Sequence, residues 1–177
     1  EKKPGHVRMA IFFANGYRLA YDCQRLLGQI SLVEEPGAFA DKEKLGPDAF
    51  EDLDIDTFRR AISRRRGSIK STLMNQQVVA GIGNIYSDEI LFQAGLHPAL
   101  PANELMDKDL ENLHRAIGRV IKDSIEAGAD PSSMPADFLL PHRSEGDSCP
   151  RCGGPVKKIT ISGRSGYYFP KCQKDRR

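Results

Sequence analysis

Residues 76–98 constrain the fold of this chain most, because they combine a glycine turn with a helix whose beginning and end are both marked. Gly81 and Gly83 directly precede a run from Asn84 in which apolar residues recur at helical spacing. Gly95 marks the end of that run. The first N–H groups of a helix lack an internal partner, so the turn predicts an anion site made of backbone. The alternative is that the glycines only allow the chain to turn and that the turn binds no anion.

The composition predicts a globular chain. With 177 residues, of which 40% are apolar and 28% charged, it is long enough for one ordinary domain or two small ones. It has no apolar run of the roughly 18 residues that span a bilayer, and its beginning leads into no signal-peptide core. We therefore expect a cytoplasmic protein without a membrane partner. Cys23 stands alone in an apolar segment and is expected to be a buried free thiol.

Charge is distributed unevenly along the sequence. Residues 34–56 contain nine acids and two lysines, a balance of −7, whereas residues 145–177 contain eight basic and three acidic side chains, a balance of +5. This asymmetry predicts one face that attracts a polyanion and another that avoids it. For the acidic stretch, ordinary solvated surface charge is the alternative.

The beginning of the chain predicts an incomplete β-domain. Residues 6–13 and 17–21 favour strands, and the Asn-Gly pair between them is a strong hairpin signal. A third strand is expected over residues 29–33. Three strands bury too little surface for an independent domain.

Helical patterns follow from residue 46 onward and predict a compact bundle. Asp54 and Asp107 are expected to cap two of the helices, and Ile125 belongs to the predicted apolar face of the last one. The first helix is strongly basic beside its apolar stripe, which favours nucleic-acid contact or a solvated surface. His114 is expected to be structural. The predicted helices cover residues 55–65, 68–76, 84–94 and 107–127, and a short irregular or helical connection follows over residues 129–140.

The C-terminal segment has the pattern of a zinc finger with one ligand missing. Cys149 and Cys152 form a knuckle, and β-favouring runs at 156–161 and 167–169 predict a hairpin. Cys172 is the only cysteine of the second knuckle. Three thiolates leave structural zinc open as a cofactor; His142 is a candidate fourth ligand.

Several motifs together resemble the formamidopyrimidine-DNA glycosylase and endonuclease VIII family of base-excision repair enzymes. The matching residues are Ile69-Lys70, Leu73-Met74-Asn75-Gln76, the run from Val78 to Tyr86, Asp88-Glu89, Leu91-Phe92, Ala94-Gly95 and His97-Pro98, with Cys149, Cys152, Gly163-Arg164 and Cys172-Gln173 in the finger. The resemblance covers nearly the whole chain. It implies an α+β fold with a partial antiparallel β-domain over residues 1–45, a helix–two-turns–helix DNA-binding domain over 46–140 and a zinc-finger-like hairpin over 141–177.

By this resemblance, the partner is double-stranded DNA that carries a damaged base or an abasic site. Asn84 and the backbone around Gly83 would grip a phosphate beside the lesion, and Lys70, which would lie near the same backbone, is a further expected DNA-binding residue. Arg164 at the hairpin tip would hold the flanking phosphates. The family everts the damaged base and fills the vacated stack. Arg25 and Leu27 match the intercalating positions, although ordinary strand packing is the alternative for Leu27.

Two departures from the family pattern bear on activity. The family's nucleophile is an N-terminal proline followed by glutamate. Here Pro4 is internal, so no catalytic residue is identified in this sequence, and whether the chain is itself an enzyme is left open. Phe169 stands where a zinc cysteine is expected, which implies either an apolar replacement for the metal or a three-cysteine zinc site.

The resemblance therefore implies the DNA-binding portion of a bifunctional DNA glycosylase/AP lyase, monomeric and in the bacterial cytosol or nucleoid. A non-catalytic DNA-binding protein derived from the same family is the first alternative. A zinc-ribbon module that binds RNA or protein is the second, and the glycine-turn motif argues against it.

Overall fold

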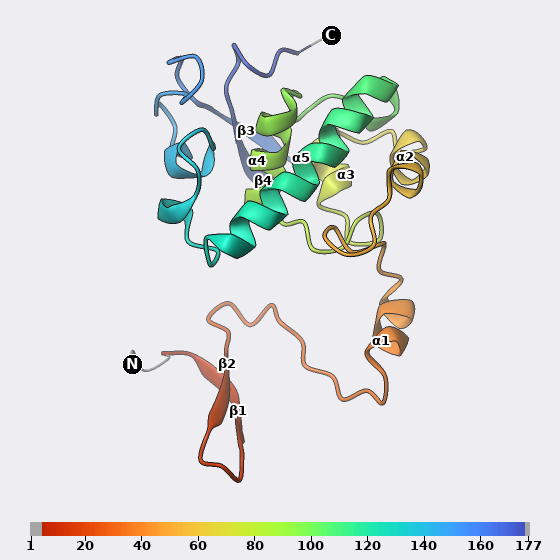
Figure 1. Cartoon of the computed structure of the whole chain (residues 1–177), viewed down its shortest axis with the longest axis vertical. Coiled ribbons are helices and arrows are strands. Elements are labelled where there is room, and N and C mark those ends of the chain that lie inside the picture. Colours follow the sequence, from red (N-terminus) through yellow and green to blue (C-terminus); the bar gives the residue numbers. More distant parts are fainter. Residues whose placement is uncertain (1–4, 176–177) are drawn as a thin grey trace. The chain divides into compact units, whose positions relative to one another are not determined.

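The computed structural model describes residues 5–175, and its contacts divide the chain into two units, residues 1–39 and 40–177. The fold is α+β: it contains two separate two-stranded antiparallel sheets and a group of helices (Figure 1).

The first unit contains the predicted hairpin. Strand β1 (Val7–Phe12) pairs with β2 (Arg18–Asp22), and the ladder joins Met9 to Tyr21 and Phe12 to Arg18. Gly16 has a φ of 83°, a backbone conformation that suits glycine in a tight turn. Most side chains on both strands are exposed. The Asn-Gly signal therefore identified the turn and both strands.

The third predicted strand, over residues 29–33, is wrong. This segment has no strand conformation, and Leu32 is fully exposed. A β-favouring run forms a strand only where a neighbour completes its ladder, and no described strand pairs with this run. Helix α1 (Pro36–Glu43), which has no buried residue, was not predicted from the sequence.

Four helices in the second unit follow the predicted order. They are α2 (Ile55–Ser63), α3 (Ile69–Leu73), α4 (Asn84–Ala94) and α5 (Asp107–Glu126). Figure 1 shows the long helix α5 beside α4, and these two helices pack extensively on each other. Short 3₁₀ turns connect the remainder: η1 (Ala102–Glu104), η2 (Pro131–Ser133) and η3 (Leu140–His142).

Caps explain where the helices begin and end. Asp54 accepts hydrogen bonds from the backbone N–H groups of Asp56 (3.0 Å) and Thr57 (2.9 Å), as predicted. Gly95 ends α4 in the left-handed region, with a φ of 69°. The predicted cap at Asp107 is wrong by one residue: Met106 is the N-cap of α5.

The main core lies where α2, α3, α4 and α5 meet. Its fully buried members include Phe58, Leu73, Leu91 and Leu113. The prediction that Ile125 belongs to this core is wrong, because its side chain is 60% exposed near the end of α5. Its neighbour Ser124 is buried instead, so Ile125 lies at the edge of the buried face of the helix.

The finger contributes a second hairpin and a small core. Strand β3 (Lys157–Ile161) pairs with β4 (Arg164–Tyr168), and β4 packs on α4. Ser162 and Gly163 both have positive φ, 50° and 73°, which is the geometry of a two-residue I′ turn. The predicted five-residue loop is therefore too long, and Arg164 is the first residue of β4. The second core consists of Phe92, Leu139, Cys149, Val156 and Phe169.

Candidate nucleic-acid interface

Residues 46–49 run alongside the segment that precedes α4 and are hydrogen-bonded to it. Gly46 N–H donates to Gln76 O (2.8 Å), and Ala49 N–H donates to Ala80 O (3.1 Å). A Cβ atom at Gly46 would lie 2.6 Å from Val78 O, so only glycine allows this close approach. The glycine turn therefore sits on a fixed support.

The turn leaves backbone donors free at the start of α4. Gly83 is the N-cap and has no side chain to satisfy them; the first helical bond is Ser87 N–H to Gly83 O (2.9 Å). Gln76 fixes the turn from one side, because it donates to Ile82 O (2.9 Å) and accepts from Gly81 N–H (3.0 Å). Gly83 itself is exposed. This is the predicted arrangement for a backbone anion site.

Lys70 does not present its charge to solvent. Its side chain is fully buried, and its Nζ donates to Asp88 Oδ1 (2.5 Å), to Ser87 Oγ (3.1 Å) and to Asn84 O (3.1 Å). Burial lowers the pKa of Lys70, and the Asp88 carboxylate opposes this effect. Arg143 completes the cluster with two hydrogen bonds to Asp88 Oδ2, at 2.8 and 3.1 Å. The buried pair thus ties α3 to the first turn of α4.

Asn84 joins the start of α4 to the finger hairpin. Its Nδ2 donates to Ser165 O (3.0 Å), whereas its Oδ1 is buried and accepts no hydrogen bond from the described residues. Gly166, the next residue in β4, allows the close packing, since a Cβ there would lie 3.1 Å from Lys70 Cε and 3.2 Å from Asp88 Oδ1. The hairpin is therefore seated on the α3–α4 segment.

Arg164 stands at the edge of the same surface. It is exposed, and its Nη1 lies 3.8 Å from Met74 Sδ, at the end of α3. The structure thus brings together three sequence-predicted residues, Gly83, Asn84 and Arg164. We call these three residues the clamp.

The predicted wedge residues belong to the first unit. Arg25 and Leu27 lie in a loop after β2, and the side chain of Leu27 is 80% exposed. Leu27 does not pack in a strand, which removes the alternative interpretation for this residue. Their role as a wedge stays a prediction. Cys23, predicted to be buried, is only half-buried, and backbone N–H groups led by that of Gly28 lower its pKa.

Three cysteines of the finger meet as the pattern predicts. The sulfur atoms of Cys149, Cys152 and Cys172 all lie within 4.8 Å of one another, and those of Cys149 and Cys172 are 3.6 Å apart. Tetrahedral zinc with Zn–S bonds of about 2.3 Å places its sulfur ligands about 3.8 Å apart. The cluster therefore fits three corners of a structural zinc site. Zinc bound there would tie the knuckle to the end of β4.

No fourth metal ligand comes from His, Asp or Glu in the part of the chain that the structure describes, so the guess that His142 supplies it is wrong. Burial raises the pKa of the Cys172 thiol to about 12, and the two neighbouring thiols add to the shift. The N–H of Gly154 instead lowers the pKa of Cys152. Phe169 is completely buried.

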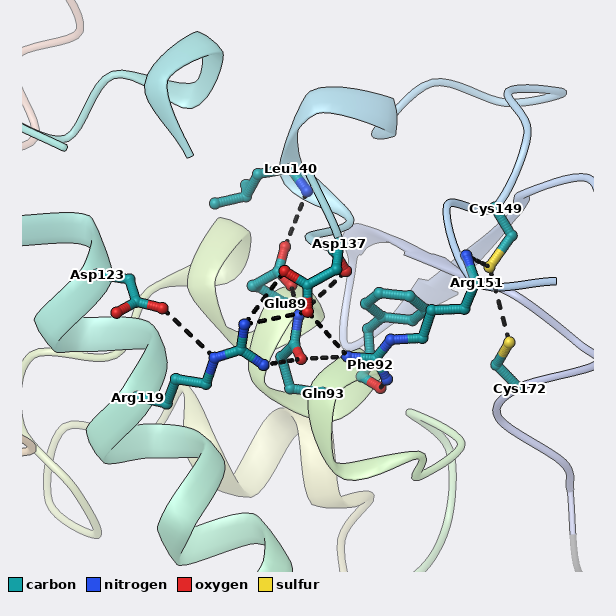
Figure 2. A network of polar contacts seen from close by, with 10 residues as sticks. All are labelled: Glu89, Phe92, Gln93, Arg119, Asp123, Asp137, Leu140, Cys149, Arg151 and Cys172. Carbon is teal, nitrogen blue, oxygen red and sulfur yellow. Dashed lines mark hydrogen bonds and ion pairs between the residues drawn. The ribbon is translucent and has the colours of Figure 1, made fainter. Parts of the chain in front are cut away.

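A second polar network holds α4 to α5 and to the segment before the finger (Figure 2). Glu89 is fully buried and accepts hydrogen bonds from Leu140 N–H and Gln93 Nε2, both at 2.8 Å. Burial raises the pKa of this carboxyl group. Arg119 donates to Gln93 Oε1 (3.1 Å) and to both carboxylate oxygens of Asp137, at 3.0 and 3.1 Å.

Arg59, on the basic face of α2, and His114, on α5, both contact other residues of this chain. Arg59 forms ion pairs with Asp56 (2.9 Å) and Asp107 (3.3 Å). The His114 Nε2 atom lies 2.6 Å from Leu53 O, and its ring packs near Phe58. His114 is therefore structural, as predicted.

Two family models match the chain. Residues 45–136 match the formamidopyrimidine-DNA glycosylase H2TH domain, and residues 146–174 match the zinc finger found in FPG and IleRS. The formamidopyrimidine-DNA glycosylase of Lactobacillus delbrueckii subsp. bulgaricus is 36% identical over 182 residues, which cover 96% of this chain and 67% of that protein. The chain belongs to the formamidopyrimidine-DNA glycosylase family.

Other members of the family match a similar share of this chain. The enzyme of Herpetosiphon aurantiacus is 34% identical over 179 residues, which cover 95% of this chain and 66% of that protein. The chain thus spans about two thirds of the length of such relatives. Among solved structures, the complex of Lactococcus lactis Fpg with DNA that contains an abasic site superposes with a TM-score of 0.83 at 29% identity, over 99% of this chain and 69% of that one.

Membership of the formamidopyrimidine-DNA glycosylase family explains the glycine turn and the finger, but sequence reasoning missed the residues that join them. Asp88 lies on α4, Arg143 directly follows η3 and Gly166 lies on β4. Of the three, only Asp88 had a sequence signal, because the polar run at 87–89 stands directly before three apolar residues. No described helix is long and apolar enough to cross a membrane.

Proposed function

We propose that this chain is the DNA-binding portion of a base-excision repair enzyme, a bifunctional DNA glycosylase/AP lyase. The observation that carries the proposal is the hydrogen bond from Asn84 to Ser165 O, which holds the α4 N-terminus and the Arg164 hairpin together as one surface. The Lactococcus lactis relative binds abasic-site DNA and is similar over nearly the whole chain. Double-stranded DNA with a damaged base or an abasic site is therefore the proposed partner.

Each clamp residue supplies a phosphate ligand of a different kind. The N–H groups that follow Gly83 carry the positive end of the α4 dipole. Asn84 adds the side-chain N–H that its hydrogen bond to Ser165 O leaves unused, and Arg164 adds a guanidinium that binds phosphate through two parallel hydrogen bonds. Two such points on one strand favour a bend at the nucleotide between them. Arg25 and Leu27 are proposed to enter the space that the everted base leaves.

Lys70 acts indirectly in this proposal. Its ammonium group is enclosed by Asp88, Ser87 and the carbonyl of Asn84, so it positions the phosphate-binding turn without touching DNA. The zinc-finger cysteines likewise act at a distance, because they fix the end of β4 rather than its turn.

The sharpest test is the variant Gly83→Ala. The free protein has open space around a Cβ at this position, and its φ of −102° is allowed for alanine, so the fold should be unchanged. A phosphate drawn onto the helix N-terminus would meet the added methyl group. We expect weaker binding to a duplex with a tetrahydrofuran abasic analogue, by about 1–3 kcal/mol, the scale of a charge-assisted hydrogen bond.

Arg115→Ala is the matched control. Arg115 lines a pocket with Gln93 and Ala94, at the opposite end of α4 from Gly83, and an 11-residue helix is about 16 Å long. We expect this variant to bind the same duplex like the wild type. Unchanged binding by Gly83→Ala, with its melting temperature preserved, would contradict the proposed site.

A non-catalytic DNA-binding protein is the second candidate, because the clamp binds phosphates and its three residues supply no nucleophile. Both candidates need the clamp, and they differ in the chemistry of the encoded protein. Sequence upstream of Glu1 that begins Met-Pro-Glu supports the enzyme. A native start at Glu1 supports the second candidate.

A further inference from the structure

The finger contains two turns that are closed by the same kind of backbone hydrogen bond, and the fourth residue of each turn is a cysteine. In the first, Gly153 N–H donates to Cys149 O (3.0 Å); in the second, Gln173 N–H donates to Phe169 O (2.9 Å). Phe169 therefore occupies in the second turn the backbone position that Cys149 occupies in the first. A cysteine at position 169 would complete a four-thiolate site.

At the corner of the site where a fourth thiolate would lie, Phe169 is part of an apolar core. Its side chain is completely buried, and its ring meets that of Phe92 edge-on, with 5.2 Å between centroids and 61° between planes. Leu139 and Val156 belong to the same core. The stabilisation that a bound metal gives to a small zinc finger is thus supplied here by the packing of apolar side chains.

Each turn is also attached, without a metal, to α4 or to the residues that directly follow it. Arg151, in the first turn, donates to Phe92 O (3.2 Å) and to Gln93 Oε1, and its guanidinium lies 4.3 Å from the centre of the Phe92 ring (Figure 2). Gln173, which follows the second turn, is buried: its Nε2 donates to Leu96 O (2.9 Å), and its Oε1 accepts from Phe169 N–H (3.0 Å).

The three thiols that remain occupy one side of a tetrahedral site. Cys149 is buried, Cys172 is half-buried and Cys152 is exposed, so solvent reaches the group from the Cys152 side. Among the described residues, no His, Asp or Glu joins the cluster. A divalent ion held by the three sulfur atoms needs a fourth donor from outside the protein.

We propose that the finger binds a zinc-like divalent ion through three thiolates only, with an exchangeable external donor in the fourth position, while the Phe169 core keeps the hairpin folded without the metal. The resting donor is water. A small nitrogen or sulfur ligand replaces it, because such donors suit zinc-like ions.

Cobalt(II) substitution of the full chain tests the coordination. Cobalt bound to the wild type should show about three quarters of the sulfur-to-metal charge-transfer absorbance of Phe169→Cys, in proportion to three and four thiolates. Imidazole should shift the visible bands of the wild type and leave those of Phe169→Cys unchanged. Phe169→Leu, which keeps an apolar side chain without a ligand, should behave like the wild type.

Removal of the metal tests the second half of the proposal. In the metal-free wild type, the NMR resonances of β3 and β4 should keep their dispersion. Their collapse on chelation would overturn the proposal, as would equal charge-transfer absorbance in wild type and Phe169→Cys, an imidazole-insensitive wild-type spectrum, or failure of the wild type to bind cobalt. The imidazole and chelation results depend on the wild type alone and decide the question even if Phe169→Cys does not fold.

Discussion

Asp88→Asn should destabilise the second unit more than any exposed charge substitution. The change removes the carboxylate that faces the buried ammonium of Lys70 at 2.5 Å, and it also deprives Arg143 of its charged partner. Removing one member of a buried ion pair costs about 3–5 kcal/mol. For a chain of this length, that corresponds to a fall of about 6–20 °C in melting temperature.

The chemistry of Lys70 sets an upper limit to this cost. A neutral Lys70 amine carries no buried charge, so the destabilisation cannot exceed the free energy of removing the proton. From the ordinary lysine pKa of 10.5, that removal costs about 5 kcal/mol at pH 7. In the variant, the unfolded state then binds a proton that the folded state lacks. The free energy of unfolding should therefore rise with pH, by up to about 1.4 kcal/mol per pH unit below pH 10.5.

The assay is urea unfolding followed by helical circular dichroism, at several pH values between 6 and 9. Asp56→Asn is the control, since its carboxylate is paired with Arg59 but its side chain is 69% exposed. That pair should contribute no more than about 1 kcal/mol. The reasoning fails if both variants lose the same stability, or if Asp88→Asn shows no steeper dependence on pH than the wild type.

Three further predictions concern packing, chemistry and metal. Gly166→Ala should lower the free energy of unfolding by about 1–3 kcal/mol, because its Cβ would press on Lys70 and Asp88 at 3.1–3.2 Å; an unchanged denaturation midpoint would count against that contact. Borohydride trapping on abasic-site DNA should give no covalent complex with this chain alone, and a trapped band would reveal a nucleophilic amine that we have not identified. Protein purified without chelator should contain at most one zinc per chain by elemental analysis, and zinc should be absent from Cys149→Ser; equal zinc in both proteins would place the metal elsewhere.

Local signals in the sequence predicted the elements that are stabilised by their own neighbours. The turn before Asn84, the cap at Asp54 and the end of α4 at Gly95 all appear where the pattern put them, because each depends on residues within one or two turns. The strand over residues 29–33 failed for the converse reason. A strand needs a partner to complete its ladder, no described strand pairs with this run, and propensity carries no information about a partner.

The residues of the site show the same difference between features that local sequence predicts and features that depend on distant contacts. Gly83, Asn84 and Arg164 were identified by motif, but the motif says nothing of how their side chains are supported. Sequence reasoning expected Lys70 close to DNA, whereas the structure encloses it with Asp88. Nothing local marks a lysine as buried, since its burial depends on Gly166 arriving from a distant strand.

The salt dependence of DNA binding tests the clamp most directly. Each phosphate contact by a basic side chain releases counterions, so Arg164→Ala should reduce the slope of log K against log salt by about 1, while Arg115→Ala should leave it at the wild-type value. The measurement uses the abasic-analogue duplex over a series of salt concentrations. Equal slopes for wild type and Arg164→Ala would contradict the assignment of Arg164 as a phosphate ligand, and with it the clamp.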